Sequence, residues 1–260
     1  MLSKAQGERQ KAGNQLVLSF LAVRRAIGAL GYFLPVVLAL YGVASGGILT
    51  SLSAYYYSPM REIFVGCLIA QAVFLWSYEG YRDTGTWLTD RLVARVASVA
   101  VALVALVPTG FPVTPNTGLP VAGLSITSPP MPRPPSCTFL QCVLGNSASA
   151  LVHLIAAGVF FAALAVYCLV LFVRGSEDSA EKQASNRIYR ICGWTIIASI
   201  GLIGLLFVTG LDQRLAALRP VFWLEFVACF AFATSWTVKG DALRPMVQMM
   251  ARPRGLTRKP

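Results

Sequence analysis

The chain has 260 residues, of which 56% are hydrophobic and only 13% are charged, and its formal net charge is +11. Soluble domains carry about 25% charged residues. The composition therefore excludes an ordinary soluble protein and predicts an all-α integral membrane protein. Basic residues are not interleaved with aromatic residues in any patch, so we expect no nucleic acid among the partners despite the positive charge.

The chain begins with a basic segment, residues 1–25, which contains a short apolar stretch at 15–23. This stretch is too short to cross a bilayer, and it is followed by Arg24 and Arg25. Such a pattern predicts a helix that lies in the membrane interface and leads into the first span.

Six apolar runs follow, each able to cross a hydrocarbon core of about 30 Å, for which a helix needs about 17–25 residues. A lipid-exposed backbone must satisfy its own hydrogen bonds, and these runs lack the alternation of barrel strands, so we predict helices. The resulting six-transmembrane-helix bundle occupies residues 26–240. Its spans are expected near residues 26–48, 63–80, 92–109, 148–173, 188–209 and 220–238.

The basic residues predict the orientation of this bundle. All but four of the 22 Lys and Arg residues lie in or beside the N-terminal segment, the loops after the second and fourth spans, and the tail of residues 241–260. The four exceptions are Arg61, Arg133, Arg214 and Arg219. By the positive-inside rule both termini are cytoplasmic (N-in/C-in), as an even number of spans requires. We expect a bacterial inner (cytoplasmic) membrane.

A tyrosine-rich segment precedes the second span on the outer side. Its candidate ligand-binding residues are Ser53, Tyr55, Tyr56, Tyr57, Arg61 and Glu62. Tyrosine rings partition into the membrane interface while their hydroxyl groups stay hydrated. One interpretation is therefore an aromatic anchor at the end of a helix. The other is a ligand-binding site formed by this segment.

The outer loop of residues 110–147 is rich in proline, which is typical of extended chain rather than helix or central strand. A loop of this length is usually a lid, a docking surface for another protein or disordered. Cys137 and Cys142 lie in this loop, on the oxidising side of the membrane, so a disulfide between them is expected. Their spacing is not that of a redox-active C-x-x-C motif.

Four ionisable residues are expected within one or two turns of the outer interface: Arg61, Glu62, His153 and Glu225. Ionisable residues within spans are costly and mark functional sites. One hypothesis is an outward-facing polar pocket between spans two, four and six. His153 would be a general acid or base, Glu225 its partner, and Arg61 the ligand of a phosphate or carboxylate. The structural alternative pairs Arg61 with Glu225 or Glu62, while His153 bonds a neighbouring helix.

A metal site formed by Glu62, His153 and Glu225 is the weaker possibility, because the chain has one histidine and such sites more often recruit several. We therefore predict no metal and no cofactor. No nucleotide-binding motif and no hydrolase or metalloprotease motif occurs in the sequence. The sequence thus leaves open whether the protein is an enzyme.

Glycines recur in two of the predicted spans. Small residues at such spacings let helices approach closely, so we expect packing seams rather than hinges. The glycines concerned are Gly28, Gly31, Gly42, Gly193, Gly201 and Gly204.

Several stretches of the sequence resemble a bacterial family of six-span inner-membrane proteins of unknown function. They are LTSLSAYYYSPMREIFVGCL, SYEGYRD, LVALVPTGFP, NRIYRICGW and FWLEFVACFAFATSWTVKGD. More loosely, the chain is similar to the membrane superfamily that contains the GPI-anchor remodelling factor and the DRAM autophagy modulators. The resemblance implies the architecture and no particular activity. It does not extend to the alkaline ceramidase-like hydrolases, which hold a metal with several histidines.

Together these observations predict a multi-pass membrane protein that binds or modifies a lipid or another amphiphile through an outward-facing polar pocket. Membrane lipids are then its partners. One alternative is a non-enzymatic accessory or assembly subunit of a membrane complex, which docks other membrane proteins through its proline-rich loop. A second is a small-solute transporter, which ranks last because no ionisable residue is expected near the midplane of the bilayer.

Overall fold

A computed structural model describes residues 15–80, 86–110, 138–175 and 179–251. The structure is 81% helix, and its described ranges contain no strand, which confirms the all-α class. The elements, in chain order, are α2 (Gln15–Ala44), η1 (Ser53–Tyr57), α3 (Arg61–Trp76), α4 (Asp90–Leu106), α5 (Phe139–Leu144), α6 (Asn146–Val166), η2 (Tyr167–Leu171), α7 (Ala180–Thr209), α8 (Leu211–Arg214), η3 (Ala216–Leu218), α9 (Pro220–Lys239) and α10 (Arg244–Ala251). Of the three η elements, η1 and η3 are 3-10 helices and η2 is a π-helical turn that continues α6.

Among the described residues, four segments are long and apolar enough to cross a membrane: Leu21–Ala44, Asn146–Leu171, Ala180–Thr209 and Ala216–Lys239. The protein is therefore a multi-pass membrane protein. Helices α3 and α4 lie at the positions of the second and third predicted spans, but they have only 16 and 17 residues. At 1.5 Å per residue they are about 24 and 26 Å long, slightly less than the roughly 30 Å hydrocarbon core.

Two helices begin earlier than the sequence predicts. Residues 15–23 are not a separate interfacial helix but the first turns of α2, because no Pro or Gly interrupts the chain before Gly28. Helix α7 likewise begins at Ala180 instead of near 188. Its first turn is capped by Ser179, whose side chain accepts a hydrogen bond from the backbone N–H of Lys182.

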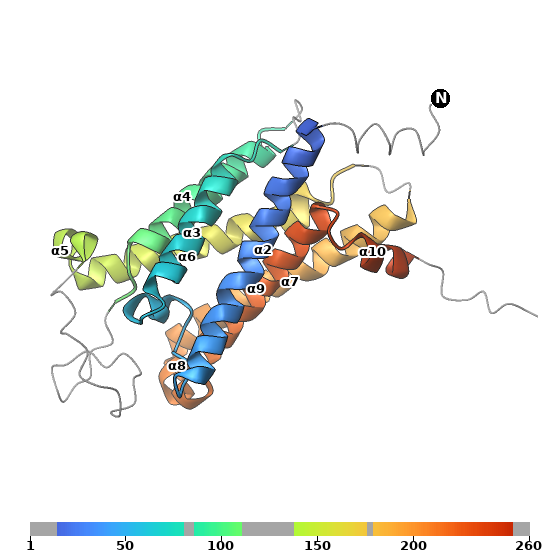
Figure 1. Cartoon of the computed structure of the whole chain (residues 1–260). Coiled ribbons are helices and arrows are strands. Elements are labelled where there is room, and N and C mark those ends of the chain that lie inside the picture. Colours follow the sequence, from blue (N-terminus) through green and yellow to red (C-terminus); the bar gives the residue numbers. More distant parts are fainter. Residues whose placement is uncertain (1–14, 81–85, 111–137, 176–178, 252–260) are drawn as a thin grey trace, which may run out of the picture.

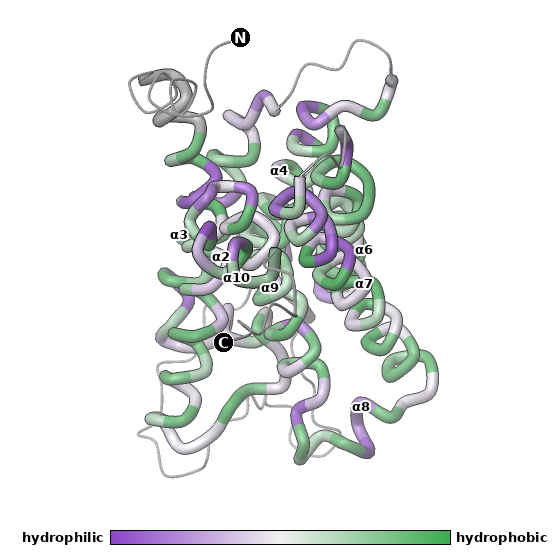
Figure 2. Tube along the Cα trace, turned by 90° about the vertical axis from the view of Figure 1, so that its right-hand side faces the viewer, coloured by the Kyte–Doolittle hydropathy of each residue, from purple (hydrophilic) through white to green (hydrophobic). Residues whose placement is uncertain are grey.

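The six longest helices in the described ranges form a closed ring in which each packs against the next, in the order α2, α3, α4, α6, α7, α9 and back to α2. Figure 1 shows α10 and the start of α2 at one end of this bundle, and α5 and α8 at the other. We name these the α10 end and the α8 end. In Figure 2 the part of α7 that leads to α8 is mostly hydrophobic, and hydrophilic residues gather again at α8.

Glycines set the closest helix contacts, as predicted, at four of the six positions. A Cβ atom on Gly28 would lie 2.5 Å from Thr237 Oγ1, and one on Gly31 would lie 3.0 Å from the Phe232 ring, so both glycines seat α2 against α9. Gly42 and Gly193 are similarly crowded. The prediction is wrong for Gly201 and Gly204, which have nothing within 4 Å among the described residues.

Candidate functional site

The tyrosine-rich segment lies inside the α8 end of the bundle rather than on its surface. The rings of Tyr55 and Tyr56 are buried in a cluster with Leu38, Phe64 and Phe222. An interfacial anchor is therefore wrong for these two residues. The close approach of α2 explains the burial of Tyr55, because its hydroxyl group occupies the space that a Cβ atom on residue 42 would fill.

Glu225, on α9, binds the start of η1. Its Oε2 atom accepts a hydrogen bond of 2.5 Å from the backbone N–H of Leu52, the residue directly before η1. The backbone N–H of Phe222 donates to the carbonyl oxygen of Thr50, which makes a second bond between the same two segments (3.1 Å). A carboxylate at the N-terminus of a helical turn satisfies N–H groups that the turn itself leaves unpaired. Glu225 thus holds η1 in place.

His153, on α6, lies between η1 and the end of α4. Its Nδ1 atom is 2.7 Å from the carbonyl oxygen of Val107, and its Nε2 atom is 2.9 Å from Ser53 Oγ. A carbonyl oxygen only accepts, so in the neutral ring Nδ1 carries the proton and Nε2 accepts from the Ser53 hydroxyl group. A serine that donates to an imidazole whose other nitrogen is held by an acceptor is the arrangement of a nucleophile and its general base.

Arg61 begins α3 on the other side of η1. Its Nη2 donates to the hydroxyl oxygen of Tyr56 at 2.9 Å, and its guanidinium carbon lies 4.5 Å from the centre of the Tyr56 ring. Within the described residues Arg61 forms no ion pair with Glu62 or Glu225, so the predicted pairing is wrong. Glu62 is exposed and Arg61 is partly buried. Among the described residues, no carboxylate balances the charge of Arg61.

Tyr57 connects η1 to α5. Its hydroxyl group donates to the carbonyl oxygen of Thr109 and accepts from Gln141 Nε2 at 2.8 Å. Burial raises the pKa of Tyr57 to about 12. Sequence reasoning missed Gln141, although the T-x-x-Q pattern that starts at Thr138 is a capping-box signature, and the structure forms that box.

Ser53 is therefore the point near which the predicted residues meet, since His153 bonds its side chain and Glu225 bonds the backbone of the preceding residue, Leu52. Among the described residues no three His, Cys, Asp or Glu side chains gather as a metal site requires. Cys142 lies on α5, but Cys137 and the rest of 111–137 lie outside the described residues. The disulfide and the role of the proline-rich loop stay predictions.

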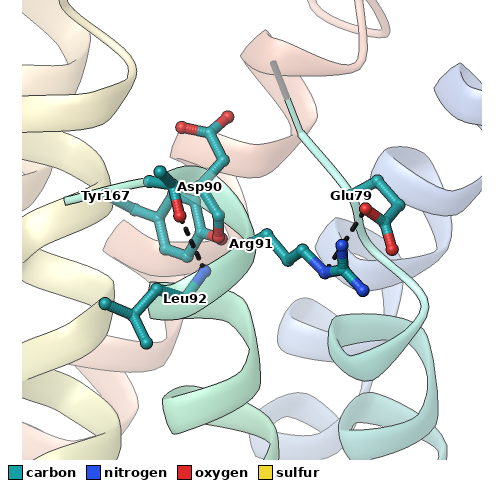
Figure 3. A network of polar contacts seen from close by, with 6 residues as sticks. Glu79, Asp90, Arg91, Leu92 and Tyr167 are labelled. Atoms are coloured by element: carbon teal, nitrogen blue, oxygen red, sulfur yellow. Dashed lines mark hydrogen bonds and ion pairs between the residues drawn. The ribbon is translucent and has the colours of Figure 1, made fainter. Parts of the chain in front are cut away.

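A second polar cluster, at the α10 end, was not predicted. Arg24 is only 3% exposed, and its Nε and Nη2 atoms donate to the hydroxyl oxygen of Tyr78 at 3.3 and 3.0 Å. The Tyr167 hydroxyl group donates to the carbonyl oxygen of Asp90 at 2.5 Å. Figure 3 shows Tyr167 beside Asp90, and Arg91 turned away toward Glu79.

The sequence did contain a signal for this cluster. Arg24, Gly28 and Gly31 are spaced four and three residues apart and so share one face of α2. The glycines place that face against α9, and the Nη1 atom of Arg24 accordingly donates to the carbonyl oxygen of Lys239 at 3.4 Å. In the sequence, Arg24 counts only as one of the basic residues that predict the topology.

Comparison with known proteins finds one family. A family model described as a protein of unknown function (DUF998) matches residues 63–231, which is more than half of the chain. The matched region runs from α3 into α9, and so contains His153 and Glu225 but neither η1 nor Arg61. No curated protein and no solved structure matches the chain.

Proposed function

The chain belongs to the DUF998 family of proteins of unknown function, and we propose that it is a six-span protein of a bacterial inner membrane that binds a lipid or another amphiphile at its α8 end. Two features support six spans. Helices α3 and α4 pack in the same ring as the four longer helices, as expected of spans in one bundle. Their lengths also fall only a few ångström short of the hydrocarbon core.

The basic residues support an orientation with the α10 end in the cytoplasm. Arg24, Arg25, Arg91 and Lys182 belong to that end, whereas Arg61, Arg214 and Arg219 belong to the α8 end. This difference follows the positive-inside rule. The α8 end, with η1, then faces the outer side of the membrane.

One observation carries the proposal of ligand binding: the guanidinium of Arg61 rests on Tyr56 without a carboxylate partner in the described residues. A guanidinium presents five donors in a planar fork that suits a phosphate or a carboxylate. Stacking on an aromatic ring restricts its geometry before a ligand arrives. An anionic headgroup at the outer interface would supply the missing negative charge.

The contact between Ser53 and His153 favours a second function, acyl transfer. Ser53 Oγ would attack the carbonyl carbon of a lipid ester while His153 Nε2 takes the serine proton. Transfer of that proton to the departing alkoxide would complete cleavage of the C–O bond and leave the acyl group on Ser53, from which water would release it. In this scheme Glu225 is a positioning residue, because it bonds the backbone of Leu52 and not the reacting atoms.

Native mass spectrometry of the gently purified protein tests the binding site. We expect wild type to retain a defined lipid mass, and Arg61→Gln to retain it about 10-fold less, the loss expected when one charge-assisted hydrogen bond is removed. Arg214→Gln is the matched control, since it removes an exposed charge from α8 at the same end.

Equal retention by wild type and Arg61→Gln would refute the site. A co-purifying protein bound without lipid would instead support an accessory subunit, docked through the proline-rich loop.

For acyl transfer the measurement is the intact mass after treatment with a fluorophosphonate. Labelling of Ser53 that is lost in His153→Gln supports the reaction, and an unlabelled Ser53 in wild type excludes it.

A further inference from the structure

A groove of about 490 Å³ lies between α4 and α6, apart from the cluster around Ser53. Its walls are aliphatic except at one position, which is Arg95. The lining residues are Arg95, Val96, Val99, Ala100 and Leu103 of α4, and Val152, Ile155, Ala156 and Val159 of α6.

The groove has the dimensions of a lipid chain in one leaflet. Arg95 and Leu103 are eight residues apart on α4, which corresponds to about 12 Å along the helix axis. One leaflet of the hydrocarbon core is about 15 Å thick, half of the roughly 30 Å core. The aliphatic part of the groove therefore matches an extended acyl chain that runs parallel to the helices.

Arg95 lies toward the α10 end of the groove, near the start of α4. Its guanidinium carbon is 5.3 Å from the centre of the Trp76 ring, at the last residue of α3. A half-exposed tryptophan at a helix end is typical of the headgroup level of a membrane. The contact thus places the charge of Arg95 at the depth where lipid phosphates lie.

The charge of Arg95 is not balanced within the described residues. Its Nε atom is buried and has no hydrogen-bond partner there. The nearest arginine on the same helix face, Arg91, behaves differently, because its Nε atom pairs with Glu79 Oε2 at 3.5 Å. Arg95 as a whole is only partly buried, so the rest of its guanidinium can reach the membrane, where a cation without an ion pair favours an anionic partner.

We propose that this groove binds an anionic phospholipid, with one acyl chain against the aliphatic walls and the phosphate on the guanidinium of Arg95. A phosphate accepts two parallel hydrogen bonds from a guanidinium, which a carbonyl or a single water cannot. The proposal does not depend on the site at the α8 end. With the α10 end in the cytoplasm, the lipid belongs to the cytoplasmic leaflet.

The test is a native mass spectrometry titration with phosphatidylglycerol, beside phosphatidylcholine with the same acyl chains. We expect Arg95→Gln to raise the Kd for phosphatidylglycerol about 10-fold and to change that for phosphatidylcholine less. Arg91→Gln, four residues earlier on α4 and already paired, is the matched control and should leave both unchanged.

A second pair of variants tests the chain-binding part without touching the charge. Ile155→Trp fills the groove, whereas Leu154→Trp adds the same bulk to the neighbouring residue outside it. Both positions are at least half exposed, at 57% and 50%, so neither substitution disturbs the core. We expect about a 10-fold loss of phosphatidylglycerol binding for Ile155→Trp alone.

Three results would overturn the proposal. One is a Kd that Arg95→Gln leaves unchanged. Another is an equal loss in Arg91→Gln, which would indicate only the general positive charge of this end. The third is a dimer that Ile155→Trp dissociates without any lipid bound, which would make the groove an interface between copies. Arg61→Gln, which alters the α8 end, should not change the Kd at this groove.

Discussion

The two ends of the bundle bury polar groups in different ways. At the α10 end, Trp236 is fully buried among the rings of Tyr78, Tyr167 and Phe172, with ring centres 5.0, 5.1 and 5.3 Å away. At the α8 end, a five-residue 3-10 helix and the residue before it are held by single hydrogen bonds to α3, α5, α6 and α9 and to the carbonyl oxygen of Thr109, just beyond α4.

We infer from this difference that the α10 end contributes mainly to the stability of the fold and the α8 end mainly to ligand recognition. Large buried rings contribute packing energy that no ligand can replace. Single hydrogen bonds to a short segment contribute less to stability and can be rearranged when a ligand binds. We therefore expect substitutions at the α10 end to destabilise the whole protein. Substitutions at the α8 end should instead alter ligand binding and the hydrogen exchange of nearby backbone amides.

The largest effect should come from Trp236→Ala. Removing a buried tryptophan leaves a cavity and costs about 3–5 kcal/mol in the free energy of unfolding. The matched control is Trp223→Ala, on the same helix but at the α8 end and 45% exposed. Thermal unfolding in detergent should show a large loss for the first variant and a small one for the second. Equal losses would remove the distinction between the two ends.

Glu225→Ala should have the next largest effect, because it leaves the N–H group of Leu52 without its acceptor. We expect a loss of about 1.5–3 kcal/mol and faster hydrogen exchange of the amides in 50–58. Glu225→Gln keeps an acceptor oxygen and should lose less. Mass spectrometry of hydrogen exchange measures both variants. Unchanged exchange in Glu225→Ala would show that η1 is held by other contacts.

Gly80→Ala separates close packing from backbone strain. Gly80 has a φ of +65°, and a Cβ atom there would lie 2.1 Å from the Cβ atom of Asp90. The control is Gly46→Ala at the α8 end, where φ is +92° and nothing lies within 4 Å. We expect a loss of about 1–3 kcal/mol for Gly80→Ala and a smaller one for Gly46→Ala. Equal losses of stability for Gly80→Ala and Gly46→Ala in thermal unfolding would mean that backbone strain, and not the contact with Asp90, causes the loss.

The smallest effect concerns pH. The pKa of Tyr57, about 12, is above its usual value of 10, so folding favours the neutral form. The resulting stability is fully present below pH 10 and is lost as pH rises through 12. The difference in unfolding temperature between wild type and Tyr57→Phe should therefore narrow between pH 9 and 12. A constant difference would mean that Tyr57 titrates as in the unfolded chain.

The helices could be predicted from the sequence because each is an apolar run between charged or helix-breaking residues. The starts of α2 and α7 could not, because the length that a membrane requires says nothing about how far a helix continues into water. Gly193 and Gly201 look alike in the sequence. Only their surroundings in the fold distinguish them. The side chain of Leu169 lies close to Gly193, whereas no described atom lies within 4 Å of a Cβ atom on Gly201.

The candidate site was predicted as a set of residues and not as a set of contacts. Ser53, His153 and Glu225 were all singled out, and the structure brings them together. The burial of Tyr55 depends on Gly42 of another helix, and the stacking of Arg61 on Tyr56 depends on the turn that η1 makes. Such distances arise from tertiary packing, for which a single sequence contains no periodic signal.

The position of α9 has a consequence for biogenesis. It closes the ring between α7 and α2, yet of the six helices in the ring it is the last to leave the ribosome, whereas α2 is the first. Until then the face of α2 with Arg24 and Gly28 lacks the helix that covers it. A chain that stops before residue 220 keeps this face open and exposes a buried cation in the membrane. Such a chain is the form that membrane quality-control proteases should remove first.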